Sequence, residues 1–480
     1  MDLTQLLISE DMLANVLRRV APRDLAACRC ACKALHAFID ARRLLRADLL
    51  PLSVGGIFIN FHGTRLSELF VRPSTGPAIS GRFDYLPRPD GYPHHQRPDC
   101  RTVKDHCNGL LLLGDHGEDL FVVNPAIRQW ESLPPRLPVS PDFACQEYLV
   151  FDPMASSHYE VFVILIPLYK AKPGDFHYNS TKHRVDPAME ESEWPPSVCA
   201  VHVFSSRSGR WEERPFVRQG KAAGTVADMR RHRDGSLDRR HAVYYRDALY
   251  VHCKTDFVMR ISLSNDKYQV ILPPMDNDNE QNNYWRNLHL GQSEKGVYLA
   301  SIHESHLQVW VLEELCGETN WALTHNKSLT PILDYDRPVL GPWVLQDINF
   351  NEYLKEYEGH NERANNLEYL MEKKLELLNS GKKELLEEKV DWDSENDNVL
   401  HKEDEVDDCG NGCLSILGFH PYKEIVFLDV SMYRGLAYHL KDSKVQDLGY
   451  LYPTTNHLAL PNECFITESF PYTPCWIGHQ

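Results

Sequence analysis

Apolar side chains recur at helical spacing near the start of the chain. Four of them fall on one face of a first helix: Leu13, Val16, Leu17 and Val20. Ser9 precedes this run and is a good N-cap residue. Pro22 ends the helix and suits the first turn of a second one. The apolar positions that follow are Leu25, Cys28 and Cys32. A third helical stretch covers residues 33–46, so the pattern predicts a small helical unit over residues 8–46.

From about residue 52 the pattern changes to short β-branched or aromatic runs separated by turn residues, which is typical of strands. The predicted strands cover residues 57–61, 110–113, 120–123, 148–151, 160–166, 201–204, 243–245, 249–251, 297–302, 307–312, 425–430 and 436–440. Only Arg246 and Asp247 separate two of these runs, which predicts a tight hairpin.

The strand region contains a loose repeat of several tens of residues. In each unit a hairpin is followed by a polar turn and by a Trp or apolar residue, as at Trp130 and Trp211. Radially repeated four-stranded sheets have this signature. We therefore predict an α+β multidomain chain, with N-terminal helices followed by a mainly antiparallel all-β domain that is β-propeller-like. A β-sandwich or an irregular β-domain is the alternative.

Residues 351–408 interrupt the strand pattern. Helically spaced apolar residues in a Glu- and Lys-rich background are followed by an acidic stretch over residues 391–408. Residues 352–408 hold 19 acidic and 8 basic side chains, a net charge of −11. The pattern predicts a solvated, partly helical or disordered insertion between two blades. The expected domains are residues 1–50, residues 51–350 with 409–480, and this insertion; an acidic loop without a specific task is the alternative reading of the insertion.

Composition narrows the function classes. The net charge of −17 argues against nonspecific binding to nucleic acid. The longest apolar stretch, residues 161–168, is too short to cross a membrane, and the first residues lack the pattern of a signal peptide. Thirteen cysteines without a regular interval argue against a disulfide framework. We expect reduced thiols and a cytoplasmic or nuclear location.

The motifs of nucleophilic, nucleotide-binding and zinc-dependent enzymes are missing from the sequence, which predicts no catalytic residues, no cofactor and no metal site. The richest metal-like cluster is His94, His95, Cys100, His106 and Cys107. Four nearby prolines favour an exposed loop for it. Cys409 and Cys413 lack the second ligand pair that a zinc site needs.

Two stretches carry a family resemblance. Residues 8–20, Ile-Ser-Glu-Asp-Met-Leu-Ala-Asn-Val-Leu-Arg-Arg-Val, with residues 21–25 and 29–33, resemble an F-box spanning roughly residues 5–45. Ser9, Ala21 and Leu35 stand where that family usually has Pro, Pro and Trp. Residues 107–112, 123–130 and 417–421 resemble the F-box-associated, kelch-like β-domain common in plant proteins.

The resemblance implies a substrate-recruiting subunit of an SCF (Skp–cullin–F-box) ubiquitin ligase rather than an enzyme. The implied partners are a Skp-type adaptor, through it a cullin–RING ligase, and a protein target bound by the β-domain. The candidate adaptor-binding residues are Ile8, Leu13, Val16, Leu17, Val20, Pro22, Leu25, Cys30 and Cys32. In so small a unit about half of these should be internal core, and Ile8, Pro22 and Leu25 are the stronger contact candidates because they lie at helix ends and junctions.

Two readings of function stay open beside this one. The three departures allow a protein-interaction module with a degenerate F-box outside any ligase. An enzyme on a propeller scaffold has no motif to support it. Target-binding loops cannot be read from the sequence; the aromatic candidates are Trp285, Trp343 and Tyr353, for each of which burial in the β-core is the competing interpretation.

Overall fold

The computed structural model describes residues 10–20, 25, 28, 32–42, 44, 53–62, 66–72, 79–86, 102–114, 119–170, 187–231, 241–274, 287–303, 305–315, 318–333, 342–346, 349, 399–400, 413–431, 434–451 and 465–476. The predicted insertion at residues 351–408 lies outside these residues, apart from Val399 and Leu400. Val399 forms an isolated antiparallel bridge with Gln446.

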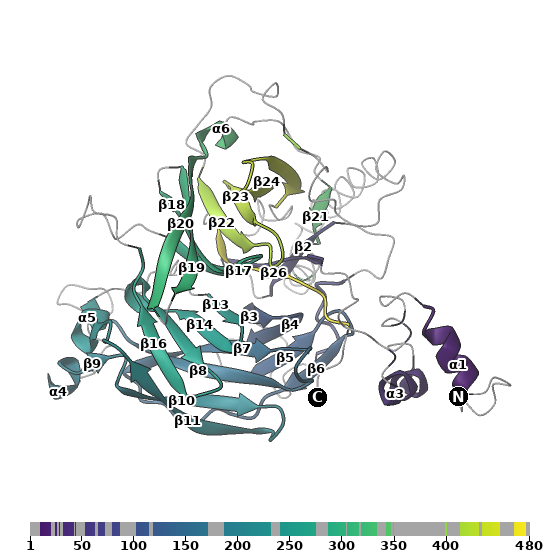
Figure 1. Cartoon of the computed structure of the whole chain (residues 1–480), viewed down its shortest axis with the longest axis horizontal. Coiled ribbons are helices and arrows are strands. Elements are labelled where there is room, and N and C mark those ends of the chain that lie inside the picture. The colour runs from purple at the N-terminus through teal and green to yellow at the C-terminus, as the bar shows by residue number, and fades with distance from the viewer. Residues whose placement is uncertain are drawn as a thin grey trace, which may run out of the picture.

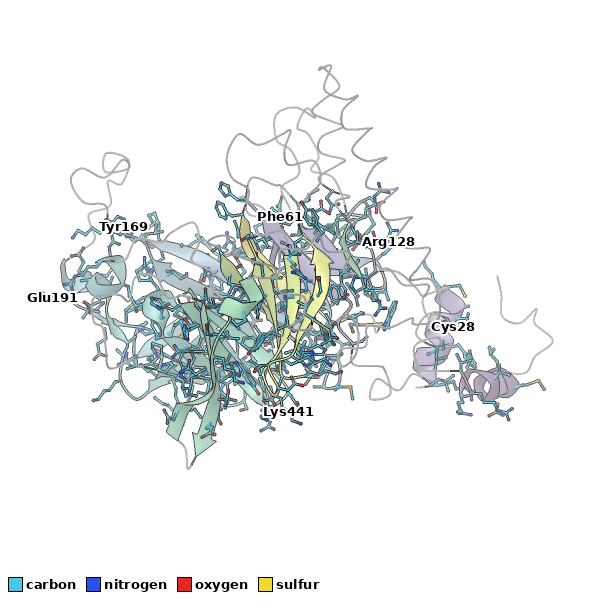
Figure 2. The ribbon with its side chains drawn as sticks, turned by 90° about the horizontal axis from the view of Figure 1, so that it is seen from above. Cys28, Phe61, Arg128, Tyr169, Glu191 and Lys441 are labelled. Carbon is cyan, nitrogen blue, oxygen red and sulfur yellow. The ribbon has the colours of Figure 1, made fainter. Side chains whose placement is uncertain are left out.

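The N-terminal unit is helical, as predicted. Its described helices are α1 (Glu10–Leu17) and α3 (Lys33–Ala41). They share one small apolar core made of Ala14, Leu17, Leu25, Ile39 and Leu44. Figure 1 shows both helices outside the β-domain, and Figure 2 shows Cys28 apart from Phe61 and Arg128, which belong to that domain.

The β-domain consists of four-stranded antiparallel units, here called blades, of which the described residues form six. Blade 1 contains β26 (Ile466–Tyr472), β1 (Gly56–Phe61), β2 (Glu68–Val71) and β21 (Trp343–Leu345). Blade 2 contains β3 (Thr102–Cys107), β4 (Leu110–Gly114), β5 (Leu120–Asn124) and β6 (Gln129–Ser132). Blade 3 contains β7 (Phe143–Phe151), β8 (Tyr159–Pro167), β10 (Val198–Ser205) and β11 (Arg210–Gln219).

Blade 4 contains β13 (Ala242–Tyr245), β14 (Ala248–His252), β15 (Val258–Ser262) and β16 (Lys267–Ile271). Blade 5 contains β17 (Asn287–Ser293), β18 (Gly296–His303), β19 (His306–Leu315) and β20 (Glu318–Ser328). Blade 6 contains β22 (Leu414–Phe419), β23 (Ile425–Val430), β24 (Arg434–His439) and β25 (Val445–Tyr450). Smaller elements are α4 (Pro187–Glu190), β9 (Glu193–Trp194), β12 (Gly224–Thr225), α5 (Val226–Arg231), the 3-10 turn η3 (Lys254–Asp256) and α6 (Thr330–Leu333).

The blades form a ring. The first strands β26, β3, β7, β13, β17 and β22 each contact the next, and β22 returns to β26. Blade 1 closes the ring because β26, from the end of the β-domain, pairs with β1 from its start, with Ile57 opposite Pro471. Outer strands also join neighbouring blades in parallel, β11 with β16 and β21 with β25. The propeller-like fold predicted from the repeat is confirmed.

The hydrophobic core lies between the blades. Six apolar clusters each combine side chains from two neighbouring blades. A blade therefore has both faces covered, which explains why residues 110–113 of β4 are all apolar and all buried. One blade alone would expose both faces, so the ring is the unit that folds.

Candidate adaptor-binding surface and the centre of the ring

Helix α1 divides into a buried and an exposed side. Ala14 and Leu17 are 1% and 6% exposed and pack in the helical core. Met12 and Val16 are 57% and 55% exposed. They lie four residues apart, so they share one face of the helix, turned away from Leu17. Two large apolar side chains thus form a small exposed ridge, called here the α1 ridge.

The surroundings of the α1 ridge are polar and basic. Arg18 and Arg19 are exposed, and Arg18 donates a hydrogen bond from Nη1 to Asn15 Oδ1 at 3.1 Å. An apolar ridge with a positive rim is suited to a partner that offers an apolar groove bordered by carboxylates.

The structure separates the candidate adaptor-binding residues into groups. Leu17 and Leu25 are buried core residues, while Leu13 and Val20 are half-buried against that core. Val16 and Cys32 are exposed. The remaining candidates lie outside the described residues: Ile8, Pro22 and Cys30.

Sequence reasoning missed Met12 as a member of this surface. Its signal was present in the sequence, because Met12 and Val16 have the i, i+4 spacing that places two side chains on one helix face. The pairing of Met12 with Val16 was overlooked because the apolar face through Leu13 and Leu17 is sufficient to predict an amphipathic helix without a second apolar face.

The inner strands of the ring are joined by buried side chains. Asp105 Oδ2 accepts a hydrogen bond from the Leu149 amide at 2.7 Å. Two residues on, Cys107 Sγ accepts from the Phe151 amide and donates to the Phe151 carbonyl, both at 3.3 Å. Alternate side chains of β3 therefore bind the backbone of β7, linking blade 2 to blade 3.

Burial shifts the titration of these groups. It raises the pKa of Asp105 to about 8, against the lowering effect of amide hydrogen bonds from Leu149 and His106. Burial also raises the pKa of the Cys107 thiol. The prediction that His106 and Cys107 lie in an exposed loop is wrong, because both belong to β3 and Cys107 is buried. His94, His95 and Cys100 lie outside the described residues.

The centre of the ring holds a cavity of about 80 Å³, bordered by β3, β13, β17, β22 and β26. The rings of His241 and His289 approach to 4.0 Å between centroids. Burial lowers the pKa of neighbouring His106 to about 4. A Cβ on Gly291 would lie 2.3 Å from the Phe419 ring, so this ring occupies the space that a side chain at position 291 would need.

In the described part of the chain, the His, Cys, Asp and Glu side chains form no group of three placed to hold a metal ion, and none of the helices is long and apolar enough to cross a bilayer. Of the aromatic target-binding candidates, Trp343 is 2% exposed and belongs to the core. Trp285 and Tyr353 lie outside the described residues.

Comparison with known proteins agrees with the helical unit. A family model of the F-box domain matches residues 6–47. No curated protein matches the chain.

Similar solved structures include YCF48 bound to a D1 peptide, at 9% identity, covering 83% of this chain and 82% of that one with a TM-score of 0.31. Another is the WD40 domain of SCAP from fission yeast, at 10% identity, covering 58% and 54% of the two chains with a TM-score of 0.25. Neither likeness is close enough to bear on function.

Proposed function

We propose that this chain, which carries an F-box domain at residues 6–47, is the substrate-recruiting subunit of an SCF ubiquitin ligase. The observation that supports this most is the division of α1. Leu17 holds the helical unit together from one side, and Met12 with Val16 presents apolar surface on the other. A helix that packs only against its own core needs apolar side chains on one face, so the second apolar face of α1 supports a contact with a partner.

In the proposed mechanism the α1 ridge enters an apolar groove of a Skp-type adaptor. Fully burying one such side chain contributes about 1.5–3 kcal/mol, and central apolar contacts dominate the affinity of interfaces of this kind. The blade ring then presents a protein target near the ligase. Ubiquitin transfer takes place on other subunits, so the chain itself requires no catalytic residues and acts in the cytoplasm or nucleus.

The domain division follows the same proposal. Residues 1–50 bind the adaptor, while residues 51–350 and 409–480 together build the F-box-associated β-domain of the kind common in plant proteins. In this proposal residues 351–408 are an insertion between two blades. Along the chain, β21 of blade 1 precedes this segment and β22 of blade 6 follows it.

One observation favours a second candidate, an interaction module with a degenerate F-box. Leu35 stands where the family usually has Trp, and it packs half-buried against the core of Leu17 and Leu25. A leucine fills less of that core than a tryptophan, so α3 has less apolar surface holding it against α1.

Binding of the full chain to a purified Skp-type adaptor separates the two candidates. We expect a stoichiometric complex by calorimetry and by co-elution in size-exclusion chromatography. Absence of a complex at concentrations up to ~50 μM, where contacts of even ~10 μM affinity would show, would favour the interaction module instead.

A further inference from the structure

The two middle strands of blade 3 separate before they end. β8 and β10 pair over residues 160–163 and 202–205, and their pairing does not continue into the described residues 164–167 and 198–201. Each of these two segments stays paired on its other side, residues 164–167 with β7 and residues 198–201 with β11. The sheet therefore opens between residues 164–167 and residues 198–201, which together are called here the blade 3 slot.

Backbone groups at Leu165 and Ala200 point into the blade 3 slot. In an antiparallel pair of strands, successive residues turn their N–H and C=O groups to opposite sides. The Leu168 amide donates to the Asp142 carbonyl on the β7 side, so Leu165, three positions away, faces the slot. Ala200 stands opposite Pro215, which has no N–H, and this fits a pair whose backbone groups point away from each other. Within the described part of blade 3, these two strand edges have no strand opposite them.

A pocket of about 250 Å³ occupies the blade 3 slot, and all eight residues of the slot line it. Its other walls are mainly apolar and partly aromatic. Trp194 at the end of β9 stacks on Phe143, with ring centroids 5.5 Å apart. Phe257 and Met259, which are 1% and 2% exposed, form part of the inner wall. Such a lining suits an apolar side chain, and its flat rings suit an aromatic one.

Both sides of the slot are held in place by contacts with neighbouring elements. On the β10 side, the Tyr268 hydroxyl of β16 donates to the Pro196 carbonyl. On the β8 side, Lys254 Nζ donates to the Pro167 carbonyl at 3.1 Å. A ligand would therefore meet walls that are already ordered, which lowers the entropic cost of binding.

The apolar surface continues from the pocket onto the outside of blade 3. Val198, which lines the pocket, pairs with Val217 on β11, and the two are 55% and 51% exposed. Tyr169, just after β8, and Glu191, just before β9, lie at the same edge of the domain in Figure 2. An occupant of the slot can thus reach from the pocket to the exposed valines, which is more than one ring can cover.

We propose that the blade 3 slot binds an extended peptide segment of a protein partner, its backbone paired with the open edge at Ala200 and one aromatic or branched apolar side chain in the pocket. In strand addition of this kind, main-chain hydrogen bonds supply affinity and a side-chain pocket supplies specificity. An apolar cavity of ~150 Å³ accepts benzene, so about 250 Å³ has room for a large side chain. The inference rests on the proposed function only for the source of the segment, which is the target.

The experiment titrates short peptides into the full-length protein. End-blocked threonine pentapeptides carry tryptophan, leucine, alanine or aspartate at the central position, because threonine favours an extended backbone. The tryptophan and leucine peptides should bind at least about tenfold more tightly than the alanine peptide, and the aspartate peptide should bind most weakly. The tryptophan peptide with methylated backbone nitrogens keeps its side chain, yet it should bind at least about fivefold more weakly.

A methyl signal locates the bound peptide. Met259 borders the pocket, whereas Met154 is 64% exposed on another part of blade 3. With methionine methyl groups labelled for NMR, the tryptophan peptide should shift the Met259 signal and leave that of Met154 unchanged. The signal is assigned with Met259→Leu.

Variants test the strand edge and the pocket separately. Ala200→Pro removes the N–H of the open edge and should weaken the tryptophan peptide at least about fivefold, whereas Ala200→Val keeps this N–H and is the matched control. Cys199→Phe places a ring in the pocket and should weaken the peptide similarly. Leu323→Phe adds a ring at a position 52% exposed on blade 5 and should change nothing.

Four wild-type results would overturn the proposal: equal binding of all the central residues, equal binding of free indole and the tryptophan peptide, an unmoved Met259 signal, or no binding up to ~5 mM. Dimerisation of the wild-type chain that Ala200→Pro abolishes would assign the slot to a second copy instead. The wild-type titrations decide the matter even if a variant does not fold. Adaptor binding is measured separately on the helical unit, so its failure is distinguishable from a failure of the slot.

Discussion

The carboxylate of Asp105 and the amide of Leu149, 2.7 Å apart, join the innermost strands of two neighbouring blades. The contact places an ionisable group inside the ring, where burial raises its pKa to about 8. Glu468, on the closing strand β26, raises it further through charge repulsion. The ring therefore favours the protonated form of Asp105.

We predict that Asp105 makes the β-domain less stable as pH rises from 6.5 to 8. The unfolded chain releases this proton near pH 4, so the folded state holds one more proton and the free energy of unfolding falls as pH increases. Asp105→Asn keeps an acceptor for Leu149 and removes the titration. Its urea midpoint should stay nearly constant over this range, while that of the wild type declines.

The measurement is limited to pH 6.5 to 8 because buried histidines change the free energy of unfolding in the opposite direction at lower pH. Burial lowers the pKa of His106 to about 4 and that of His420 to about 3. Below pH 6.5 the unfolded chain binds more protons at these sites, and stability falls as pH decreases. A wild-type midpoint that is flat above pH 6.5, or an Asp105→Asn curve parallel to it, would contradict the assignment to Asp105.

The α1 ridge gives the second prediction. Met12→Asp or Val16→Asp should weaken adaptor binding at least about tenfold, because each removes apolar contact and brings a charge into the interface. Asn15→Asp adds the same charge to the same helix without removing apolar surface, and it should have a much smaller effect. Calorimetry with the adaptor measures all three.

A core position on the same helix should behave differently. Leu17→Asp places a charge in the small core with Leu25 and Ile39, so we expect the helical unit to unfold and trypsin to cut within its first 45 residues. The two ridge variants should resist trypsin as the wild type does. If Val16→Asp were cleaved equally fast, the loss of binding would reflect unfolding and not a contact.

The centre of the ring gives the third prediction. A Cβ on Gly291 would lie 2.3 Å from Cδ2 of Phe419, between blades 5 and 6. Gly291→Ala should therefore lower the free energy of unfolding by about 1–3 kcal/mol, as overpacking does elsewhere. Adding Phe419→Leu should recover part of this loss in urea unfolding, since a smaller side chain relieves the contact. Additive losses would show that the two positions do not touch.

Ring closure gives the fourth prediction. Tyr472 on β26 is fully buried, stands edge-on to Phe58 of β1, and donates to the Gly109 carbonyl of blade 2 at 3.2 Å. Tyr472→Ala should cost about 3–5 kcal/mol, and Tyr472→Phe about 1 kcal/mol through the lost hydrogen bond. Tyr450→Ala, at a position 43% exposed, is the control and should change stability much less. Similar effects at both sites would argue against closure by β26.

Local features of the fold could be predicted from the sequence. The hairpin at Arg246 and Asp247 is confirmed, and the φ angles of 46° and 60° are those of a two-residue turn matched to strand twist. Strand positions were visible because each short apolar run is bounded by turn residues. These features depend on a few neighbouring residues, which a sequence displays directly.

Features that depend on distant residues could not be predicted. The parallel pairs Val217 with Lys267 and Trp343 with Gly449 have no local pattern. The Lys254 ammonium and the Pro167 carbonyl that it contacts lie on neighbouring blades and are 87 positions apart in the sequence. On α1, one stripe was predicted to contain both Val16 and Leu17. Successive helical residues are about 100° apart, and the structure buries one and exposes the other.

The closing strand also has a consequence for how the protein forms during synthesis. Asn60 on β1 contacts Glu468 on β26, and 408 residues separate them. The ribosome adds ~5–20 residues per second, so β26 is translated about 20–80 s after β1. The N-terminal helices can fold within that time and are then available to the proposed adaptor, whereas the ring is incomplete until β26 has left the ribosome. Under the proposed function, adaptor binding would thus precede target binding on every newly made chain.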